Sequence, residues 1–125
     1  MIDYREQPES NIVEITIDGK ITREEYDKLA SQLEAKIKAH GSVRVLEEVR
    51  SIGGIEPSVF WKDMKFGFRH LNDFSSIAVV ADQKWIEWVT KIFKPIMRCP
   101  VAVFHLDQIE QAREWIQQQA PRAAG

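Results

Sequence analysis

Only one of the 125 residues is a cysteine, Cys99, so no disulfide can form within the chain. A disulfide-stapled secreted scaffold is therefore excluded, and a reducing compartment is the simplest expectation. The first ten residues, MIDYREQPES, hold acids and no apolar run, unlike a signal peptide or a transmembrane span. We expect a cytoplasmic protein. Any contact that it makes with a membrane should be peripheral, at the inner face of the membrane.

Residues suited to catalysis or metal binding are also few, and their spacing does not match known sites. Of the three histidines, His40 and His105 have no cysteine or carboxylate at a metal-ligand spacing. Asp63 and His70 lie seven residues apart on a similar helix face, which permits a catalytic dyad only if a side chain or water bridges two turns. The sequence has no phosphate-binding glycine loop and no nucleophile triad. We therefore expect no metal, no cofactor and no enzyme activity.

Charge is nearly balanced, with a net charge of −2, so the chain does not resemble a general nucleic-acid binder. The charges are unevenly placed, however. Residues 57–100 contain seven Lys or Arg against four Asp or Glu, a net of +3, which leaves −5 for the remainder. This basic segment suits an anionic ligand or surface, and solvated helix faces are the alternative interpretation.

Apolar residues recur with strand and helix periods in alternation along the chain. The most distinct helix begins with a capping box, in which Glu25 follows three residues after Thr22, and it runs to His40 before Gly41. Two short apolar runs, 76–81 and 101–104, are typical of strands covered on both faces. The other predicted elements are strands from Ile2 to Tyr4, at 12–17 and at 42–49, and helices from about Pro57 to Leu71, at 83–94 and after a cap formed by Asp107 and Glu110.

The resulting order, ββαβαβαβα, predicts a single-domain α/β fold with helices layered on the sheet. An antiparallel N-terminal hairpin should join a mainly parallel sheet, because strands that alternate with helices become parallel neighbours through right-handed crossovers. With 44% hydrophobic residues, the chain can form one core. The domain is expected to span residues 1–119, with 120–125 as a C-terminal tail.

The second helix has apolar side chains on two faces. One arc can pack on the sheet, whereas Val59 and Phe66 are expected to point away from it. Those two residues need a second contact, which could be the following helix, a partner chain, a bound apolar molecule or neighbouring loops. Lys62, Lys65 and Arg69 share a third side, where they either receive an anion or remain solvated. The arc toward the sheet comprises Phe60, Trp61, Met64, Phe68 and Leu71.

Two of the four tryptophans lie in one lysine-flanked segment, QKWIEWVTKIFKPIM, which begins at Gln83. At 100° per residue its large apolar side chains fall on one arc of roughly 160°. Such a helix is either a core element or one that covers a ligand or touches a membrane. Pro95 offers a break about which helix 83–94 could move as a lid. The arc comprises Trp85, Ile86, Trp88, Val89, Ile92 and Phe93, and Lys84, Glu87, Lys91 and Lys94 fill the opposite side.

Several spaced residues resemble a known family. VRVLEEV, then a W-x-D-x-K-F helix from Trp61 to Phe66, then HLNDFSSIAVVAD-x-x-W, is similar to the SpoIIAA-like family of bacterial proteins. The resemblance covers nearly the whole chain. It implies a fold like the STAS domains of anti-sigma-factor antagonists, with some similarity to lipid-binding CRAL-TRIO domains. Kinship of fold does not by itself establish a function.

The resemblance also draws attention to Ser58. In STAS switch proteins a phosphorylatable serine starts the helix after the third strand, where helix N–H groups favour added negative charge. Ser58 occupies roughly that place, but its neighbours differ from the Asp-Ser-Ser-Gly pattern of those switches. It is either a phosphorylation site or an ordinary residue of the first helical turn.

The leading hypothesis is a non-enzymatic binding module with a cavity between the second and third helices for a small hydrophobic or lipid-like ligand. Helix 83–94 would be its lid and could contact an anionic membrane, with Lys65 or Lys91 at a polar head group. The alternative is a regulatory switch that docks on a protein partner and is phosphorylated at Ser58. A homodimer through exposed apolar helices is compatible with both. The expected ligand- and membrane-binding residues are Trp61, Lys65, Phe66, Trp85, Trp88, Val89, Lys91 and Phe93.

Overall fold

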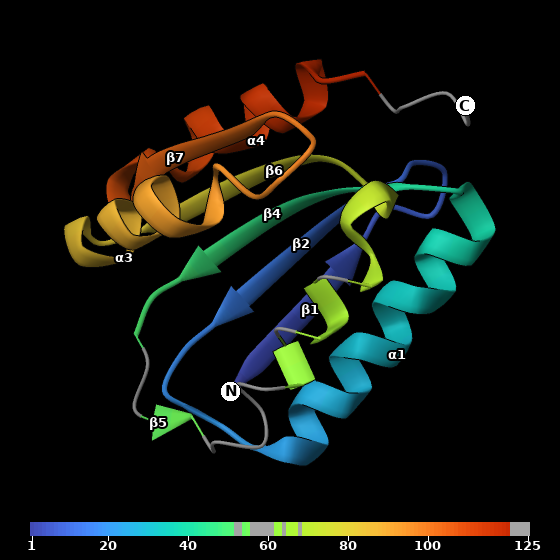
Figure 1. Cartoon of the computed structure of the whole chain (residues 1–125), viewed down its shortest axis with the longest axis horizontal. Helices are drawn as coiled ribbons and strands as arrows, with labels where there is room; N and C mark the ends of the chain where they lie inside the picture. Colours follow the sequence, from blue (N-terminus) through green and yellow to red (C-terminus); the bar gives the residue numbers. More distant parts are fainter. Residues whose placement is uncertain (52–53, 56–61, 64, 68, 121–125) are drawn as a thin grey trace.

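A five-stranded mixed sheet forms the centre of the molecule (Figure 1). This computed structural model describes residues 1–51, 54–55, 62–63, 65–67 and 69–120. In the sheet order β1-β2-β4-β6-β7, β1 is antiparallel to β2 and all other pairs are parallel, which confirms the predicted α/β fold. The strands are β1 (Ile2–Glu6), β2 (Ile12–Ile17), β4 (Val43–Val49), β6 (Phe74–Ala81) and β7 (Val101–His105).

Two very short strands lie outside this sheet and were not predicted. β3 (Lys20–Ile21) pairs in parallel with β5 (Gly54–Ile55), in a segment that was expected to be only a loop. Two residues are too few for a period-two pattern to show in the sequence. The pair links the start of α1 to the chain that follows β4.

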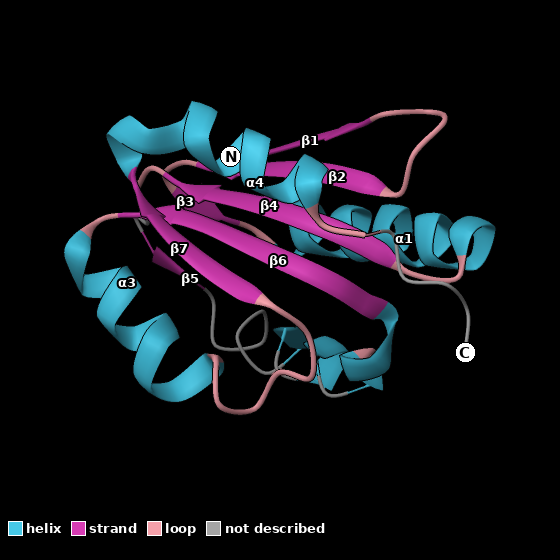
Figure 2. Ribbon diagram, turned by 90° about the horizontal axis from the view of Figure 1, so that it is seen from above, coloured by secondary structure: helices cyan, strands magenta, loops and turns pink. Residues whose placement is uncertain are grey.

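Helices cover both faces of the sheet (Figure 2). α1 (Arg23–His40) and α3 (Gln83–Trp88) lie on one face, and α4 (Ile109–Gln118) lies on the other. The described residues from 62 to 69, which we name the 62–69 segment, are helical and lie beside α1. α1 and the 62–69 segment therefore cover one half of the first face, and α3 covers the other half.

Ion pairs fix the 62–69 segment to α1. Lys62 Nζ lies 2.9 Å from Asp27 Oδ1, and Arg69 Nη2 lies 3.0 Å from Glu34 Oε1. Each pair joins residues 35 positions apart, so the segment runs parallel to α1. These contacts occupy two of the three basic side chains that the sequence offered to an anionic ligand.

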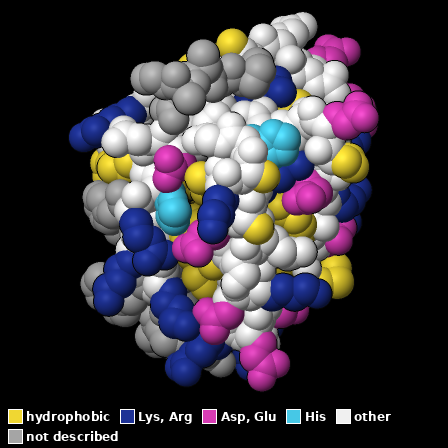
Figure 3. Space-filling model, turned by 90° about the vertical axis from the view of Figure 1, so that its right-hand side faces the viewer, with side chains coloured by type: hydrophobic (Ala, Val, Ile, Leu, Met, Phe, Trp, Pro, Cys, Tyr) yellow, Lys and Arg dark blue, Asp and Glu magenta, His cyan; other side chains and the backbone are white. Residues whose placement is uncertain are grey.

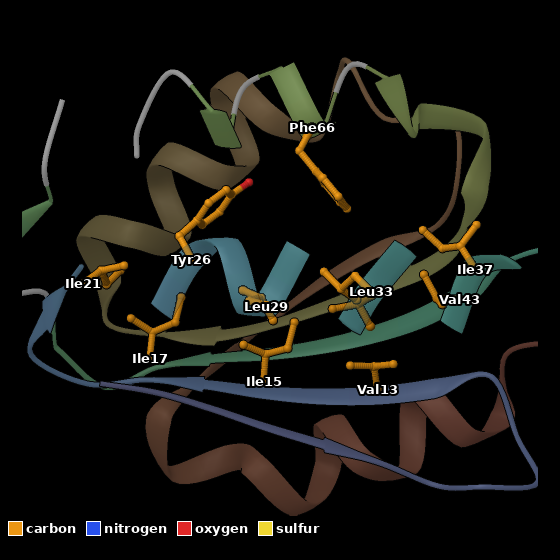
Figure 4. Close-up of a cluster of buried hydrophobic side chains, with 11 residues drawn as sticks. Val13, Ile15, Ile17, Ile21, Tyr26, Leu29, Leu33, Ile37, Val43 and Phe66 are labelled. Carbon is orange, nitrogen blue, oxygen red and sulfur yellow. The ribbon is translucent and has the colours of Figure 1, made fainter. Parts of the chain in front are cut away.

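The largest core cluster lies between α1 and the sheet (Figure 4). Val13, Ile15 and Ile17 of β2 point to α1, because alternate residues of a strand share one face. Phe66 joins this cluster from the 62–69 segment and is only 6% exposed. The expectation that Phe66 points away from the core was therefore wrong: α1 packs beneath the segment and supplies a second buried surface.

The ends of α1 follow the predicted signals. Thr22 Oγ1 accepts a hydrogen bond from the Glu25 backbone N–H (3.2 Å), and Glu25 Oε2 accepts one from the Thr22 N–H (3.1 Å). Gly41 ends the helix with φ of 82°, in the left-handed region that a residue without a side chain enters at little cost. The predicted capping box is confirmed.

Arg44 of β4 holds the C-terminal end of α4. Its side chain is 7% exposed and donates to the carbonyl oxygens of Ile116 (3.3 Å), Gln117 (3.4 Å) and Gln119 (2.8 Å). A second donor, Nε, contacts Asn11 Oδ1 at 2.6 Å. The positive charge satisfies helix carbonyls that have no partner within α4 and complements the helix dipole.

Three predicted boundaries need correction. The second helix was expected to reach Leu71, but it ends at 69 and a 3-10 turn follows at Leu71–Asp73. β6 begins two residues earlier than predicted, since Phe74 pairs with Val43. The predicted cap by Asp107 and Glu110 was wrong, because a 3-10 turn at Leu106–Gln108 precedes α4, and Gln108 Oε1 accepts from the His105 N–H at 2.8 Å.

Candidate functional site

The segment from Gln83 to Phe93, which we name the Trp helix, consists of two kinds of helix. α3 is followed directly by a π-helical turn, Val89–Phe93. Asp82 caps its start, since Asp82 Oδ1 accepts from the Trp85 N–H at 3.1 Å. This cap was readable in the sequence as an aspartate just before the apolar period, but it was not predicted.

The π-helical turn replaces the regular helix that was predicted up to Lys94. The Lys94 N–H donates to the Val89 carbonyl, five residues earlier, at 2.7 Å. Pro95 follows, and in a regular α-helix its ring would clash with the carbonyl of Lys91. π-Helical turns occur mostly as single turns within α-helices, and they are frequent at functional sites.

The inner side of the Trp helix is fixed to the sheet. Val89 is 5% exposed, and Trp85 and Phe93 are half-buried in the same cluster. The Trp85 and Trp88 rings meet edge to face, with centroids 5.8 Å apart. The buried strand residues of this cluster are Val49, Ile77, Val79, Ala81 and Val101.

The outer side of the Trp helix and its turn presents large apolar side chains to solvent. Trp88 is 42% exposed, Ile92 is 53% exposed and Ile96 is 43% exposed. These residues follow one another at intervals of four, and we name them the apolar stripe. The predicted single arc is therefore divided: one part packs on the sheet, and the other covers nothing within the described part of the chain.

Lysines accompany this stripe. Lys84, Lys91 and Lys94 are all exposed. In the described portion of the chain, none of the three forms an ion pair. The only acidic residue of the Trp helix, Glu87, accepts instead from the amide of Gln83 (3.2 Å). This part of the chain thus carries exposed apolar side chains together with exposed lysines that have no ion pair among the described residues.

The structure does not bring all the predicted binding residues together. Trp85, Trp88, Val89, Lys91 and Phe93 share the Trp helix, whereas Phe66 belongs to the separate cluster under α1 and Lys65 is exposed on the 62–69 segment. Trp61 and Ser58 lie outside the described residues. One hollow of about 320 Å³ lies at the start of β6, and its lining contains none of the predicted residues: Phe74, Ser75, Arg98, Cys99, Pro100, Gln119 and Ala120.

Glu47, Asp63 and Tyr26 form a group of titratable side chains on the same face of the sheet. The sequence analysis considered Asp63 only as a partner of His70 and did not single out Glu47. The Tyr26 hydroxyl donates to Asp63 Oδ1 (3.1 Å), which joins α1 to the 62–69 segment. Burial, reinforced by the charge of Asp63, raises the pKa of Glu47 from 4.5 to about 7. Burial also raises the pKa of Asp63 and of Tyr26.

Asp63 and His70 do not form the dyad that the sequence left open. Asp63 bonds to Tyr26, and the carboxylate that contacts His70 is Asp73, whose Oδ2 lies 2.8 Å from Nδ1. The other ring nitrogen lies 3.5 Å from Glu34 Oε1. The imidazole therefore joins α1 to the 3-10 turn and is 15% exposed, which is a structural position.

Two features are absent from the described residues. They contain no group of three or more His, Cys, Asp or Glu side chains able to hold a metal ion. Among their helices, none has the length and apolar content that crossing a membrane requires.

Comparisons with known proteins agree with this architecture. The sequence model of the SpoIIAA-like family matches residues 12–117. A crystal structure from Shewanella loihica PV-4, of an uncharacterised DUF3478-family protein with a SpoIIAA-like fold, superposes with a TM-score of 0.75. The two chains are 19% identical, and the match covers 93% of this chain and 92% of the other. No curated protein matches.

Proposed function

Because the chain belongs to the SpoIIAA-like family, in which the fold itself specifies no reaction, we propose that it is a non-enzymatic binding module whose Trp helix contacts lipid. The contact we propose is with the surface of a membrane that carries anionic head groups. The helix would lie in the plane of the interface, as amphipathic helices with aromatic and basic residues do.

The exposed apolar stripe is the observation that carries this proposal. A soluble domain normally scatters single apolar residues over its surface, and contiguous apolar patches mark contact sites. Trp88, Ile92 and Ile96 lie close together in the sequence, on the Trp helix and the turn after it, and are 42%, 53% and 43% exposed. Tryptophan suits a membrane interface in particular, because its ring is apolar and its N–H remains hydrated.

Charge favours a lipid surface over a neutral apolar partner. Lys84, Lys91 and Lys94 are exposed in the same part of the chain as the stripe, and a basic residue near an anionic leaflet contributes about 1 kcal/mol. The view from the right-hand side of Figure 1 contrasts with this arrangement. There, basic and acidic side chains are interspersed and the hydrophobic side chains appear as separate spots (Figure 3).

The contact does not require the helix to open. Trp85 and Val89 already anchor the inner side to the sheet, while the stripe already faces outward. Movement of the Trp helix as a lid would be an additional step that exposes Trp85 to a lipid-like molecule. The π-helical turn next to Pro95 supports such a hinge, because the regular hydrogen-bond ladder is interrupted there.

The stripe is large enough to give measurable binding. Covering 42% of a tryptophan of about 250 Å² removes about 100 Å² from water, or about 2.5 kcal/mol at about 25 cal/mol per Å². Covering about half of each isoleucine adds about 1 kcal/mol apiece. With the lysines the gross interaction reaches roughly 7 kcal/mol before ordering costs, in the range of reversible peripheral association.

Vesicle flotation tests the proposal. Wild-type protein should float with phosphatidylglycerol-containing vesicles and float much less with pure phosphatidylcholine. Trp88→Asp should weaken the partition on the order of 50-fold, because it removes about 2.5 kcal/mol of apolar contact and adds a like charge. Leu106→Asp is the matched control, since Leu106 is 37% exposed but lies after β7, outside the stripe, and it should float like wild type.

Equal flotation of wild type and Trp88→Asp, or no flotation of either, would contradict the proposal. Circular dichroism of both variants shows whether each remains folded. The regulatory switch is the second candidate function. Membership of the SpoIIAA-like family supports the fold that such a switch requires, but Ser58, on which the switch depends, lies outside the described residues.

A further inference from the structure

β7 is an edge strand of the sheet, and it lacks the features that normally keep an edge from pairing with another chain. Edge strands are commonly protected by charged side chains, by proline or by a bulge. The opposite edge, β1, follows this rule, because it carries the charged residues Asp3, Arg5 and Glu6. β7 has the sequence VAVFH, without Lys, Arg, Asp or Glu, and its register with β6 is continuous from Val101 to His105.

The backbone of β7 presents hydrogen-bonding groups outward at alternate residues. The Pro100 carbonyl accepts from the Ile77 N–H of β6 at 3.0 Å, so it points into the sheet. Because the direction of the N–H and C=O groups alternates along a strand, Ala102 also points to β6, whereas Val101 and Val103 point away from it. The described part of the sheet has no strand beyond β7, so the N–H and C=O groups of these two valines have no partner strand.

Both ends of this open edge are closed. Pro100 precedes Val101 and has no N–H to offer. At the other end, the outward N–H of His105 donates to Gln108 Oε1 at 2.8 Å. His105 is also the N-cap of the following 3-10 turn, so its carbonyl is used within that turn. The groups that remain are the two N–H donors and the two carbonyl acceptors of Val101 and Val103.

These groups are self-complementary about Ala102. If a second copy places its β7 antiparallel to this one, with a two-fold axis at Ala102, each Val101 lies opposite the Val103 of the other copy. Each such pair exchanges two N–H···O bonds, so every outward group of the two valines is paired. Ala102 then faces its own counterpart in a non-hydrogen-bonded pair, where side chains come closest, and its small methyl group permits this approach.

The edge is accessible to such a partner. Figure 2 looks onto β7, which lies between α3 on one side and α4 on the other, and no described helix or strand crosses in front of it. The side chains of Ala102, Val103 and Phe104 are only half-buried, although their strand lies between two helices. A second β7 would therefore cover apolar side chains as well as backbone groups.

We propose that the β7 edge is a homodimer interface, in which two copies pair antiparallel about Ala102 and join their sheets into one. A second copy suits this edge because its donors and acceptors have the spacing that the two-fold axis requires, and because β7 brings no charged side chain to its counterpart. The axis is perpendicular to the sheet, so both Trp helices lie on one face of the dimer. The proposed membrane contact, if made by the dimer, would involve two helices at once. Self-association does not depend on that contact and is tested without lipid.

Sedimentation velocity from about 10 μM to about 1 mM measures the association. The wild type should shift from monomer to dimer as its concentration rises. Val103→Pro removes an outward N–H from each copy but no hydrogen bond to β6, so the monomer should remain folded and its association should weaken at least about tenfold. Val103→Thr is the matched control, because it keeps the N–H and the branched shape, and it should associate like wild type. Circular dichroism shows whether each variant is folded.

Cross-linking tests the register of the pair and does not depend on the folding of Val103→Pro. Ala102→Cys in a Cys99→Ser background places two thiols opposite each other at a separation that a disulfide can span. Glu114→Cys in the same background, at an exposed position on α4, is the control. Mild oxidation should convert the first variant to a covalent dimer at least about ten times faster than the second.

Three results would overturn the interface. They are a wild type that stays monomeric throughout, an unchanged association of folded Val103→Pro, and equal rates of cross-linking in the two cysteine variants. A monomeric wild type is also what is expected if the edge instead accepts an extended segment of another protein. Loss of vesicle flotation alone would contradict the membrane contact and leave the dimer intact.

Discussion

Replacing Glu47 by glutamine should remove a large part of the pH dependence of folding stability between pH 4.5 and pH 8. Folding places this carboxyl group among aliphatic side chains near Asp63, where its pKa rises from 4.5 to about 7. The folded protein thus binds a proton that the unfolded chain has already released. Glutamine has nearly the same shape and no proton to exchange.

The sign follows from the raised pKa. Below pH 4.5 Glu47 is protonated in both states, so it costs the folded state nothing electrostatically. As pH rises from 4.5 to about 7, Glu47 ionises in the unfolded chain before it does in the folded protein, so the free energy of unfolding falls. Above pH 7 this decrease stays constant. At 1.36 kcal/mol per pKa unit, the full loss is up to about 3 kcal/mol. Asp63, whose pKa is also raised, changes stability in the same direction.

Urea denaturation followed by tryptophan fluorescence at pH 4.5 and pH 8 gives the required values. The difference in stability between Glu47→Gln and wild type should shift by about 3 kcal/mol in favour of the variant at pH 8. Any fixed cost of the glutamine amide cancels in this comparison. Glu114→Gln, at an exposed position on α4, should run parallel to wild type. A shift below about 0.5 kcal/mol for Glu47→Gln would refute the reasoning.

Two further predictions concern single side chains. Arg44→Met should lower the free energy of unfolding by about 3 kcal/mol, because the carbonyl oxygens of α4 and Asn11 Oδ1 lose a charged donor. Urea titrations measure this loss. A loss below about 1 kcal/mol would mean that other donors replace Arg44. Val89→Asp should destabilise the fold by more than about 3 kcal/mol in thermal melts, and Trp88→Asp should destabilise it less, since Val89 is 5% exposed and Trp88 is 42% exposed. Equal losses would show that Trp88 is a core residue.

Local signals predicted most of the fold, because they are short-range. The capping box at Thr22 and Glu25 and the apolar run of β6 depend only on neighbouring residues, and both elements formed as expected. Failures occurred where a distant contact decided the outcome. Phe66 is buried because α1 lies beneath the 62–69 segment, and no periodicity within that segment contains this information.

The Trp helix shows a different limit. Its apolar arc was visible in the sequence, but the arc could not show which part meets the sheet. A π-helical turn begins at Val89 and changes the rotation per residue, so regular helical geometry no longer assigns the faces beyond that point. The exposed stripe of Trp88, Ile92 and Ile96 emerged only from the packing of Trp85 and Val89 on β6 and β7.

Glu47 was readable in the sequence but was passed over. In VRVLEEV the two glutamates are adjacent, and adjacent residues of a strand point to opposite faces of the sheet. One of them must therefore point to the face covered by α1 and α3. The valines at 43, 45 and 49 mark the face covered by α1 and α3, and Glu47 has the same parity. Glu48, on the other face, forms an ion pair with Arg50, in which Glu48 Oε1 lies 3.2 Å from Arg50 Nε. Glu47 lies instead near Asp63 and Tyr26. Among the described residues Glu48 has an ion-pair partner and Glu47 has none, and a partly buried carboxylate without such a partner costs stability when it ionises. Glu47 is therefore the position of β4 at which folding stability should depend most on pH.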